Sequence, residues 1–112
     1  MEVRADMHLA IQGKLTNRVV LEAICARHRV RRLALFGSAT SDRFDPAASD
    51  LDFLVEFQPM SPIEHAESYF GLMEGLRQLL KMPVDLVEPG PIRNPYFRQA
   101  VQETELVLYD AA

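Results

Sequence analysis

Two aspartates separated by one residue, Asp50 and Asp52, stand at the start of an apolar segment and have the types and spacing to bind a divalent cation. Alternation along a β-strand places residues i and i+2 on one face, so we expect both carboxylates to point the same way. Two such carboxylates repel each other unless a cation lies between them. Proteins often hold Mg²⁺ with one or two carboxylates together with the phosphates of a substrate. The pair therefore predicts a metal site.

A Gly-Ser turn and a third aspartate would complete such a site. Gly37 ends the preceding apolar segment and, without a Cβ, lets backbone N–H groups approach a phosphate closely, while Ser38 adds a hydroxyl donor. Asp85 lies inside the short apolar segment 84–87, where a carboxylate needs a partner or a role. If this segment lies beside Asp52, three carboxylates could hold two ions about 3.5–4 Å apart. Together these residues predict metal-dependent chemistry on a nucleotide.

Each of these features also has an ordinary explanation when taken alone. Most Gly-Ser pairs are plain turns, and an Asp-x-Asp sequence is often a solvated strand face or a calcium site. The third aspartate, Asp85, could instead pair with Arg93 or Arg98. The order of the features along the chain is more specific: a strand, Gly-Ser, a loop, Asp-x-Asp, a helix, and a strand with an aspartate. This order favours a site for a nucleotide and a metal.

The length and composition indicate one globular domain with one modest core. The chain has 112 residues, 48% of them hydrophobic and 25% charged, and we expect a loose N-terminal arm over 1–13 and a single domain over 14–112. The net charge of −4 argues against broad nucleic-acid binding, which requires a basic surface. The basic run 27–32 departs from this average. Such a run is usually a solvated helix end, and a role in partner binding stays open.

The sequence also bears on where the protein resides. The single cysteine, Cys25, cannot form an internal disulfide, and its position on an apolar helical stripe indicates a small core residue. No signal-peptide pattern is visible, and no apolar run approaches the ~20 residues of a membrane span. We therefore expect a cytoplasmic protein without a membrane partner.

Hydrophobic periodicity and turn residues predict a sheet covered by helices, which is an α/β fold. The expected helices cover residues 14–28, 61–82 and 94–103, and the expected strands cover residues 32–36, 50–57, 84–87 and 106–109. The second strand should turn its alternate apolar residues toward a core. These residues are Leu51, Phe53, Val55 and Phe57.

The helix that begins at residue 61 has the most detailed sequence signals. Ser61 can cap it, Pro62 suits the first helical position, and Glu64 completes a capping box. Gly71 and Gly75 weaken the helix by roughly 1 kcal/mol each relative to alanine, and their spacing permits close packing against the sheet. One helical face is expected to carry the apolar residues Ile63, Ala66, Phe70, Met73, Leu76 and Leu80.

Two stretches of the chain resemble those of a known family. Leu35-Phe36-Gly37-Ser38, followed after a loop by Asp50-Leu51-Asp52, resembles the Gly-Ser/Asp-x-Asp motif of the DNA polymerase beta-like nucleotidyltransferases. The short length, Val84-Asp85-Leu86-Val87, and Asn94-Pro95-Tyr96-Phe97-Arg98 before a closing Val-Leu-Tyr resemble the minimal nucleotidyltransferases of that superfamily. The similarity covers nearly the whole chain.

The resemblance implies a mixed sheet of three to four strands flanked by helices, an α/β (α+β) fold. It also implies two Mg²⁺ ions and transfer of a nucleoside monophosphate, with ATP as the expected donor and pyrophosphate as the leaving group. Asp50, Asp52 and Asp85 would bind metal and act in catalysis, with Asp85 also serving as general base toward an acceptor hydroxyl.

For the triphosphate, the resemblance implies binding by Gly37 and Ser38. Many relatives carry a basic or aromatic residue directly after this pair and an arginine two positions further on. Here the pair is followed by Ala-Thr-Ser-Asp, and the next cation is Arg43. We expect Arg43 to take the place of the missing cation by folding back toward the phosphates.

The resemblance also implies a protein partner, because many minimal members are the antitoxin of a HEPN-domain toxin and can transfer AMP to a tyrosine of that toxin. Two other functions stay open. The chain could be a non-catalytic antitoxin that binds and masks its toxin. It could also be a transferase for a small molecule of the aminoglycoside type, completed by a homodimer, although no acceptor pocket is visible in 112 residues.

Overall fold

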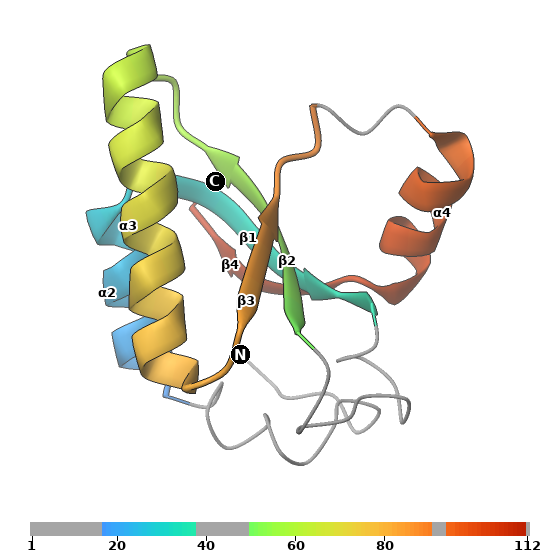
Figure 1. Ribbon diagram of the computed structural model, residues 1–112, viewed down its shortest axis with the longest axis horizontal. Coiled ribbons are helices and arrows are strands. Elements are labelled where there is room, and N and C mark those ends of the chain that lie inside the picture. Colours follow the sequence, from blue (N-terminus) through green and yellow to red (C-terminus); the bar gives the residue numbers. More distant parts are fainter. Residues whose placement is uncertain (1–16, 38–49, 91–93, 112) are drawn as a thin grey trace.

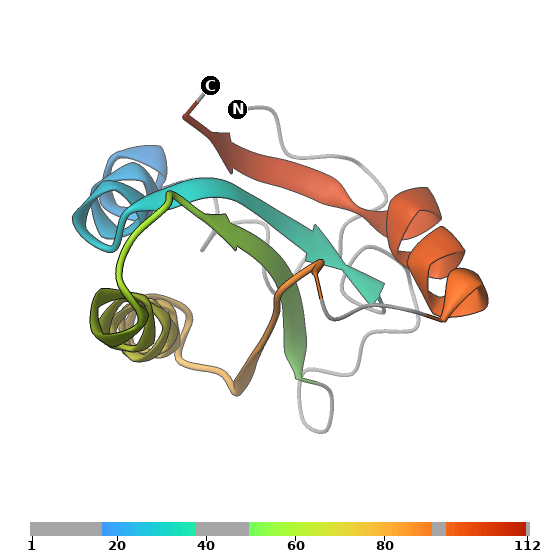
Figure 2. The same cartoon turned by 90° about the horizontal axis from the view of Figure 1, so that it is seen from above.

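The computed structural model describes residues 17–37, 50–90 and 94–111, which form a four-stranded mixed sheet with helices on both faces (Figures 1 and 2). The strands are β1 Val30–Phe36, β2 Leu51–Phe57, β3 Val84–Val87 and β4 Leu106–Asp110, and their order in the sheet is β3-β2-β1-β4. Strand β1 runs antiparallel to β2 and β4, whereas β2 and β3 are parallel. The predicted mixed sheet flanked by helices is confirmed.

Helices α2 and α3 cover one face of the sheet, and α4 lies on the other face (Figure 2). Their bounds are α2 Arg18–Arg27, α3 Pro62–Leu80 and α4 Pro95–Thr104. None of the helices in the described part of the chain is long and apolar enough to cross a membrane. The predicted arm over 1–13 lies outside the described residues.

The main core lies between the sheet and helices α2 and α3. As predicted, alternate residues of β2 point into it, and Leu51, Phe53 and Val55 are fully buried while Phe57 packs at its margin. Cys25 is also buried there, and burial raises the pKa of its thiol to about 12, which leaves it an inert core residue. The other large residues of this core are Leu21, Val30, Leu33, Leu35, Leu72, Leu76 and Leu80.

A smaller apolar cluster occupies the opposite face and holds α4 to the sheet. Phe36 of β1, Leu54 of β2 and Val101 of α4 are buried there, and Val87 of β3 packs against them. Because Asp52 is two residues before Leu54 on the same strand, its side chain emerges on this face. The two faces of the sheet therefore differ: one carries only core residues under α2 and α3, and the other carries the aspartate.

Helix α3 begins with the predicted capping box. The Ser61 hydroxyl accepts a hydrogen bond from the Glu64 amide at 3.2 Å, and the Glu64 carboxylate accepts one from the Ser61 amide at 3.2 Å. The predicted apolar face was only partly right. Ile63 and Phe70 are exposed, because the stripe that meets the sheet is rotated toward Leu72, Leu76 and Leu80.

The two glycines of α3 permit close packing, but the element they approach is α2 and not the sheet. A Cβ at Gly71 would come within 2.5 Å of the His28 ring, and a Cβ at Gly75 would come within 3.1 Å of Cγ2 of Ile24. A side chain at either position would therefore push the two helices apart. Glycine here determines how closely the helix pair can pack.

Element boundaries moved by a few residues from those predicted. Strand β1 begins at Val30, two residues earlier than expected. Arg29 adopts a left-handed conformation (φ 57°), which completes the turn after α2 within one residue, so the strand begins directly after it. Strand β2 begins at Leu51, so Asp50 lies just before the strand. Helix α2 is shorter than predicted and has Asn17 as its N-cap.

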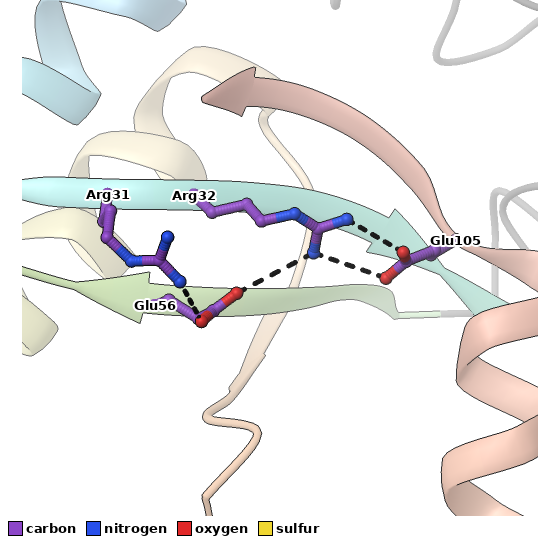
Figure 3. Close-up of polar contacts among 4 residues, drawn as sticks. All are labelled: Arg31, Arg32, Glu56 and Glu105. Carbon is purple, nitrogen blue, oxygen red and sulfur yellow. Dashed lines mark hydrogen bonds and ion pairs between the residues drawn. The ribbon is translucent and has the colours of Figure 1, made fainter. Parts of the chain in front are cut away.

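The basic run 27–32 serves mainly to join separate elements. Arg29 forms an ion pair with Glu64. Arg31 pairs with Glu56, and Arg32 pairs with both Glu56 and Glu105 (Figure 3). Arg32 makes the strongest of these, since two of its nitrogens donate to the two oxygens of Glu105 at 2.8 and 3.4 Å. Glu105 directly follows α4, so this pair attaches the end of α4 to the centre of the sheet.

Candidate active site

Asp52 and Asp85 occupy directly paired positions on the two parallel strands β2 and β3. Paired residues on neighbouring strands point to the same face, and the strands lie about 4.8 Å apart, so these two carboxylates are close neighbours. Asp52 is half-buried and Asp85 is exposed. The sequence predicted this meeting only on the condition that β3 lies beside β2, and that condition is fulfilled.

The electrostatics show that the charges of Asp85 and Asp50 both act on Asp52. Burial raises the pKa of Asp52, and the negative charges of Asp85 and then Asp50 raise it further. Within the described residues, none of the three forms an ion pair with a lysine, arginine or histidine. The alternative explanation of Asp85 as the partner of Arg98 therefore finds no support, and Arg93, the other arginine considered, lies outside the described residues. Within the described part of the chain, the negative charge of this site is not balanced by an ion pair.

Gly37 lies against this cluster at the end of β1. The residue before it, Phe36, pairs with Asp52 in the sheet, and Gly37 itself has a φ of +76°, a conformation that favours glycine. A Cβ at this position would come within 3.0 Å of Oδ2 of Asp52. The close approach of the β1 backbone to the carboxylate therefore depends on the missing side chain.

The donor set fits a divalent cation. Among the described residues, no three histidine, cysteine, aspartate or glutamate side chains are already gathered closely enough to form a ready-made metal site. Burial and then the negative charges of Asp85 and Asp50 raise the pKa of Asp52, and a divalent cation would favour its ionised form. Carboxylate oxygens are also the ligands that Mg²⁺ prefers. Asp50, Asp52 and Asp85 are the residues that could hold it.

A tyrosine that the sequence did not single out supports the strand of Asp85. The hydroxyl of Tyr69 on α3 donates a hydrogen bond to the carbonyl of Leu86 at 2.8 Å. Burial and the charges of Asp85 and Glu88 raise the pKa of this tyrosine, so its hydroxyl stays protonated and remains a donor. Tyr69 has no motif around it, and only the tertiary packing of α3 on β3 reveals its position.

The remaining predicted site residues, Ser38 and Arg43, lie outside the described residues. The structure thus brings together Asp50, Asp52, Asp85 and Gly37. Gly37, after which the loop predicted to hold the triphosphate begins in the sequence, lies beside Asp52.

A mixed sheet with paired carboxylates beside a glycine turn fits an enzyme that transfers nucleotides. Sequence comparison agrees: the nucleotidyltransferase domain family matches residues 18–107, so this chain belongs to that family and is a nucleotidyltransferase. A candidate protein adenylyltransferase of Methanocaldococcus jannaschii is 34% identical over 77 residues, which are 69% of this chain and 75% of the relative.

Solved structures share the fold. One described as a candidate minimal nucleotidyltransferase is 29% identical with a TM-score of 0.64, and the match covers 88% of this chain and 96% of that one. Another is a complex of the tri-AMPylated HEPN toxin of Shewanella oneidensis with its MNT antitoxin. It matches at 21% identity with a TM-score of 0.55, over 88% of this chain and 73% of the other. The resemblance to minimal nucleotidyltransferases is confirmed.

Proposed function

We propose that this protein transfers AMP from ATP to a hydroxyl group of a HEPN-domain partner protein and thereby acts as its antitoxin. The observation that carries the proposal is the pairing of Asp52 with Asp85 across two strands, with the charge of Asp50 close by. The names of the relatives support the donor and the acceptor class, since they include candidate protein adenylyltransferases and an antitoxin in complex with an AMPylated HEPN toxin.

In this proposal the three aspartates hold two Mg²⁺ ions. Bound Mg²⁺ supplies positive charge that offsets the triphosphate and the leaving pyrophosphate. Asp85 is the most exposed carboxylate on a regular strand of the site, so it accepts the proton of the acceptor hydroxyl. The hydroxyl oxygen then bonds to the α-phosphorus of ATP, while the bond between this phosphorus and the oxygen that bridges to the β-phosphate breaks and pyrophosphate leaves.

The chain's other predicted site residues bind the nucleotide. Gly37 lets the backbone at the end of β1 approach the phosphates beside Asp52. Ser38 donates its hydroxyl, and Arg43 supplies a positive charge for the triphosphate. Because this chemistry depends mainly on positioning and charge neutralisation, few side chains are needed.

The experiment is transfer of label from ATP to the purified HEPN partner in the presence of Mg²⁺. We expect the wild-type protein to label the partner and Asp52→Asn to lose the label by at least about a hundredfold, since the substitution removes charge at the centre of the site. Asp110→Asn is the matched control, because it makes the same change at an exposed position on the far edge strand. Equal labelling by Asp52→Asn and wild type would refute the proposed chemistry.

The alternative function is an antitoxin that masks its toxin without catalysis. A variant that lacks the site carboxylates distinguishes this alternative from the proposed function. In cells that express the toxin, an Asp50→Asn/Asp52→Asn double variant should fail to protect if transfer of AMP is the neutralising event. Full protection by this variant would show that binding alone is sufficient.

A further inference from the structure

Strand β3, which carries Asp85, is an edge strand among the described strands. The Pro83 carbonyl, just before the strand, accepts a hydrogen bond from the Leu51 amide of β2 at 2.9 Å. Backbone carbonyls alternate between the two sides of a strand, so the carbonyl of Asp85 also points to β2, whereas that of Leu86 points to the open edge. A carbonyl on such an edge finds no donor in the sheet and takes one from elsewhere.

The hydroxyl of Tyr69 is this donor, at 2.8 Å from the Leu86 carbonyl. Tyr69 lies on α3, which runs beside β3 in the opposite direction (Figure 1). One helical turn earlier, Nε2 of His65 lies 2.8 Å from Oε1 of Glu88, which directly follows β3. Four helical residues rise about 6 Å and two strand residues span about 6.6 Å, so the spacings of the two contacts match. Helix α3 therefore holds this edge at two successive positions.

The ring of Tyr69 is itself fixed in place. Its hydroxyl is bonded to β3, and its ring packs against the main core. The neighbouring ring of Phe70 meets it edge to face, with centroids 5.3 Å apart and an angle of 85° between the planes, an arrangement that adds to the stability of an aromatic pair. A donor that is held in this way keeps the Leu86 carbonyl in one position.

The anchored carbonyl belongs to the residue next to Asp85. The side chains of Val84 and Leu86 are buried in the core under α3, whereas Asp85 between them points to the opposite face and pairs with Asp52. The hydrogen bond from Tyr69 thus holds the backbone from one side of the sheet while the carboxylate acts on the other. The tyrosine can influence the site only through the position of β3.

We propose that Tyr69 is a positioning residue for nucleotide transfer, because its hydroxyl anchors the open edge of β3 and so holds the carboxylate of Asp85 beside Asp52. This inference rests on the proposed function, since it takes Asp85 as a metal ligand and proton acceptor. Groups that orient metal ligands contribute roughly 10–100-fold to metal affinity or activity, and a misplacement of about 1 Å can cost as much.

The first test compares wild type and Tyr69→Phe in transfer of label from ATP to the purified HEPN partner. The variant keeps the ring and removes only the hydroxyl. We expect kcat to fall about tenfold because Asp85 is displaced, while KM for ATP stays within about twofold because the proposed triphosphate site follows β1. Tyr109→Phe is the matched control, since Tyr109 packs against the same core from β4, at the other edge of the sheet.

The second test does not depend on transfer and asks whether Tyr69 acts through Asp85. It measures how far added Mg²⁺ raises the melting temperature. Tyr69→Phe should reduce this rise relative to wild type and to Tyr109→Phe. In an Asp85→Asn background the same substitution should reduce it no further, because the carboxylate that the hydroxyl positions is already absent.

Independent effects of Tyr69→Phe and Asp85→Asn would overturn the positioning role. A lower melting temperature with wild-type kcat and wild-type response to Mg²⁺ would also overturn it, since the hydroxyl would then serve stability alone. These failures differ from failure of the proposed function. If Asp52→Asn loses transfer while Tyr69→Phe retains it, the proposed chemistry stands and only the positioning role is overturned. If the wild type transfers no label, both are overturned.

Discussion

The backbone of Gly37 lies so close to the carboxylate of Asp52 that a methyl group on Gly37 would come within 3.0 Å of Oδ2. The end of β1 and Asp52 of β2 are thus in close contact, with no side chain between them. Gly37 also has a φ of +76°, so two independent constraints require glycine here.

Gly37→Ala should therefore reduce both stability and activity. The left-handed conformation costs an alanine about 1–2 kcal/mol, and the new methyl group displaces the Asp52 carboxylate. Urea unfolding and the rate of label transfer check the two effects. Gly90→Ala is the control, because a Cβ there meets no atom within 4 Å. A Gly37→Ala protein with wild-type stability and rate would contradict this account of the turn.

Asp52→Asn should make the metal-free protein slightly more stable while it abolishes transfer. The substitution removes the charge whose burial and whose repulsion by Asp85 and Asp50 raise the pKa of Asp52, and the gain is about 0.5 kcal/mol because solvent screens half-exposed charges. Thermal unfolding without divalent cations measures this change. Added Mg²⁺ should stabilise the wild type more than the variant. A loss of stability in the variant would indicate that the carboxylate has a structural role.

His28 should make stability depend on pH. Burial and then the charge of Arg27 lower the pKa of His28, so the unfolded chain binds its proton at a higher pH than the folded chain does. Stability therefore falls as the pH drops from about 6.5 toward the lowered folded pKa, and it is fully present above that window. Solvent exposure keeps the slope below the limit of about 1.4 kcal/mol per pH unit for one proton.

The measurement is the urea midpoint at pH 5 to 8 for the wild type and for His28→Gln. The difference between the two curves should be confined to the acidic part of this range. His65→Gln serves as the comparison, since His65 lies in the first turn of α3 and pairs with Glu88. If the two histidine variants change the pH dependence in the same way, the effect does not come from the burial of His28.

The pair Arg32–Glu105 should contribute more stability than an exposed pair. Both side chains are 22% exposed and two hydrogen bonds join them, so a double-mutant cycle with Arg32→Met and Glu105→Gln should give a coupling of about 1–2 kcal/mol. The exposed pair Arg18–Glu22 should give only about 0.3–0.5 kcal/mol. Equal coupling energies would mean that partial burial does not strengthen the pair.

Local patterns in the sequence predicted the parts of the fold that depend on neighbouring residues. The capping box at Ser61 and the alternation that buries Phe53 and turns Asp52 to the other face both follow from spacing along one element. The adjacency of Asp85 and Asp52 could be stated only as a condition, because strand order depends on contacts between distant parts of the chain. The family resemblance, not spacing, supplied the expectation of a mixed sheet.

The parts that were wrong also depend on tertiary packing. Ile63 and Phe70 have the spacing of a buried helical stripe, but the sheet contacts a neighbouring stripe of the same helix. Gly71 and Gly75 indicate a close approach without naming the partner, which proved to be α2. The basic run gave no sign that distant glutamates would neutralise most of it.

The third carboxylate of the site lies on a four-residue strand at the edge of the sheet. Among the described strands, β3 has a neighbour on one side only, and the hydroxyl of Tyr69 donates a hydrogen bond to the Leu86 carbonyl in its middle. Edge segments of this kind open more often than central strands, so the amides of β3 should exchange with deuterium sooner than those of β1. Each such opening removes Asp85 from the site while Asp52 stays in place. The enzyme would therefore lose its third carboxylate reversibly, on the timescale of local breathing and well before global unfolding.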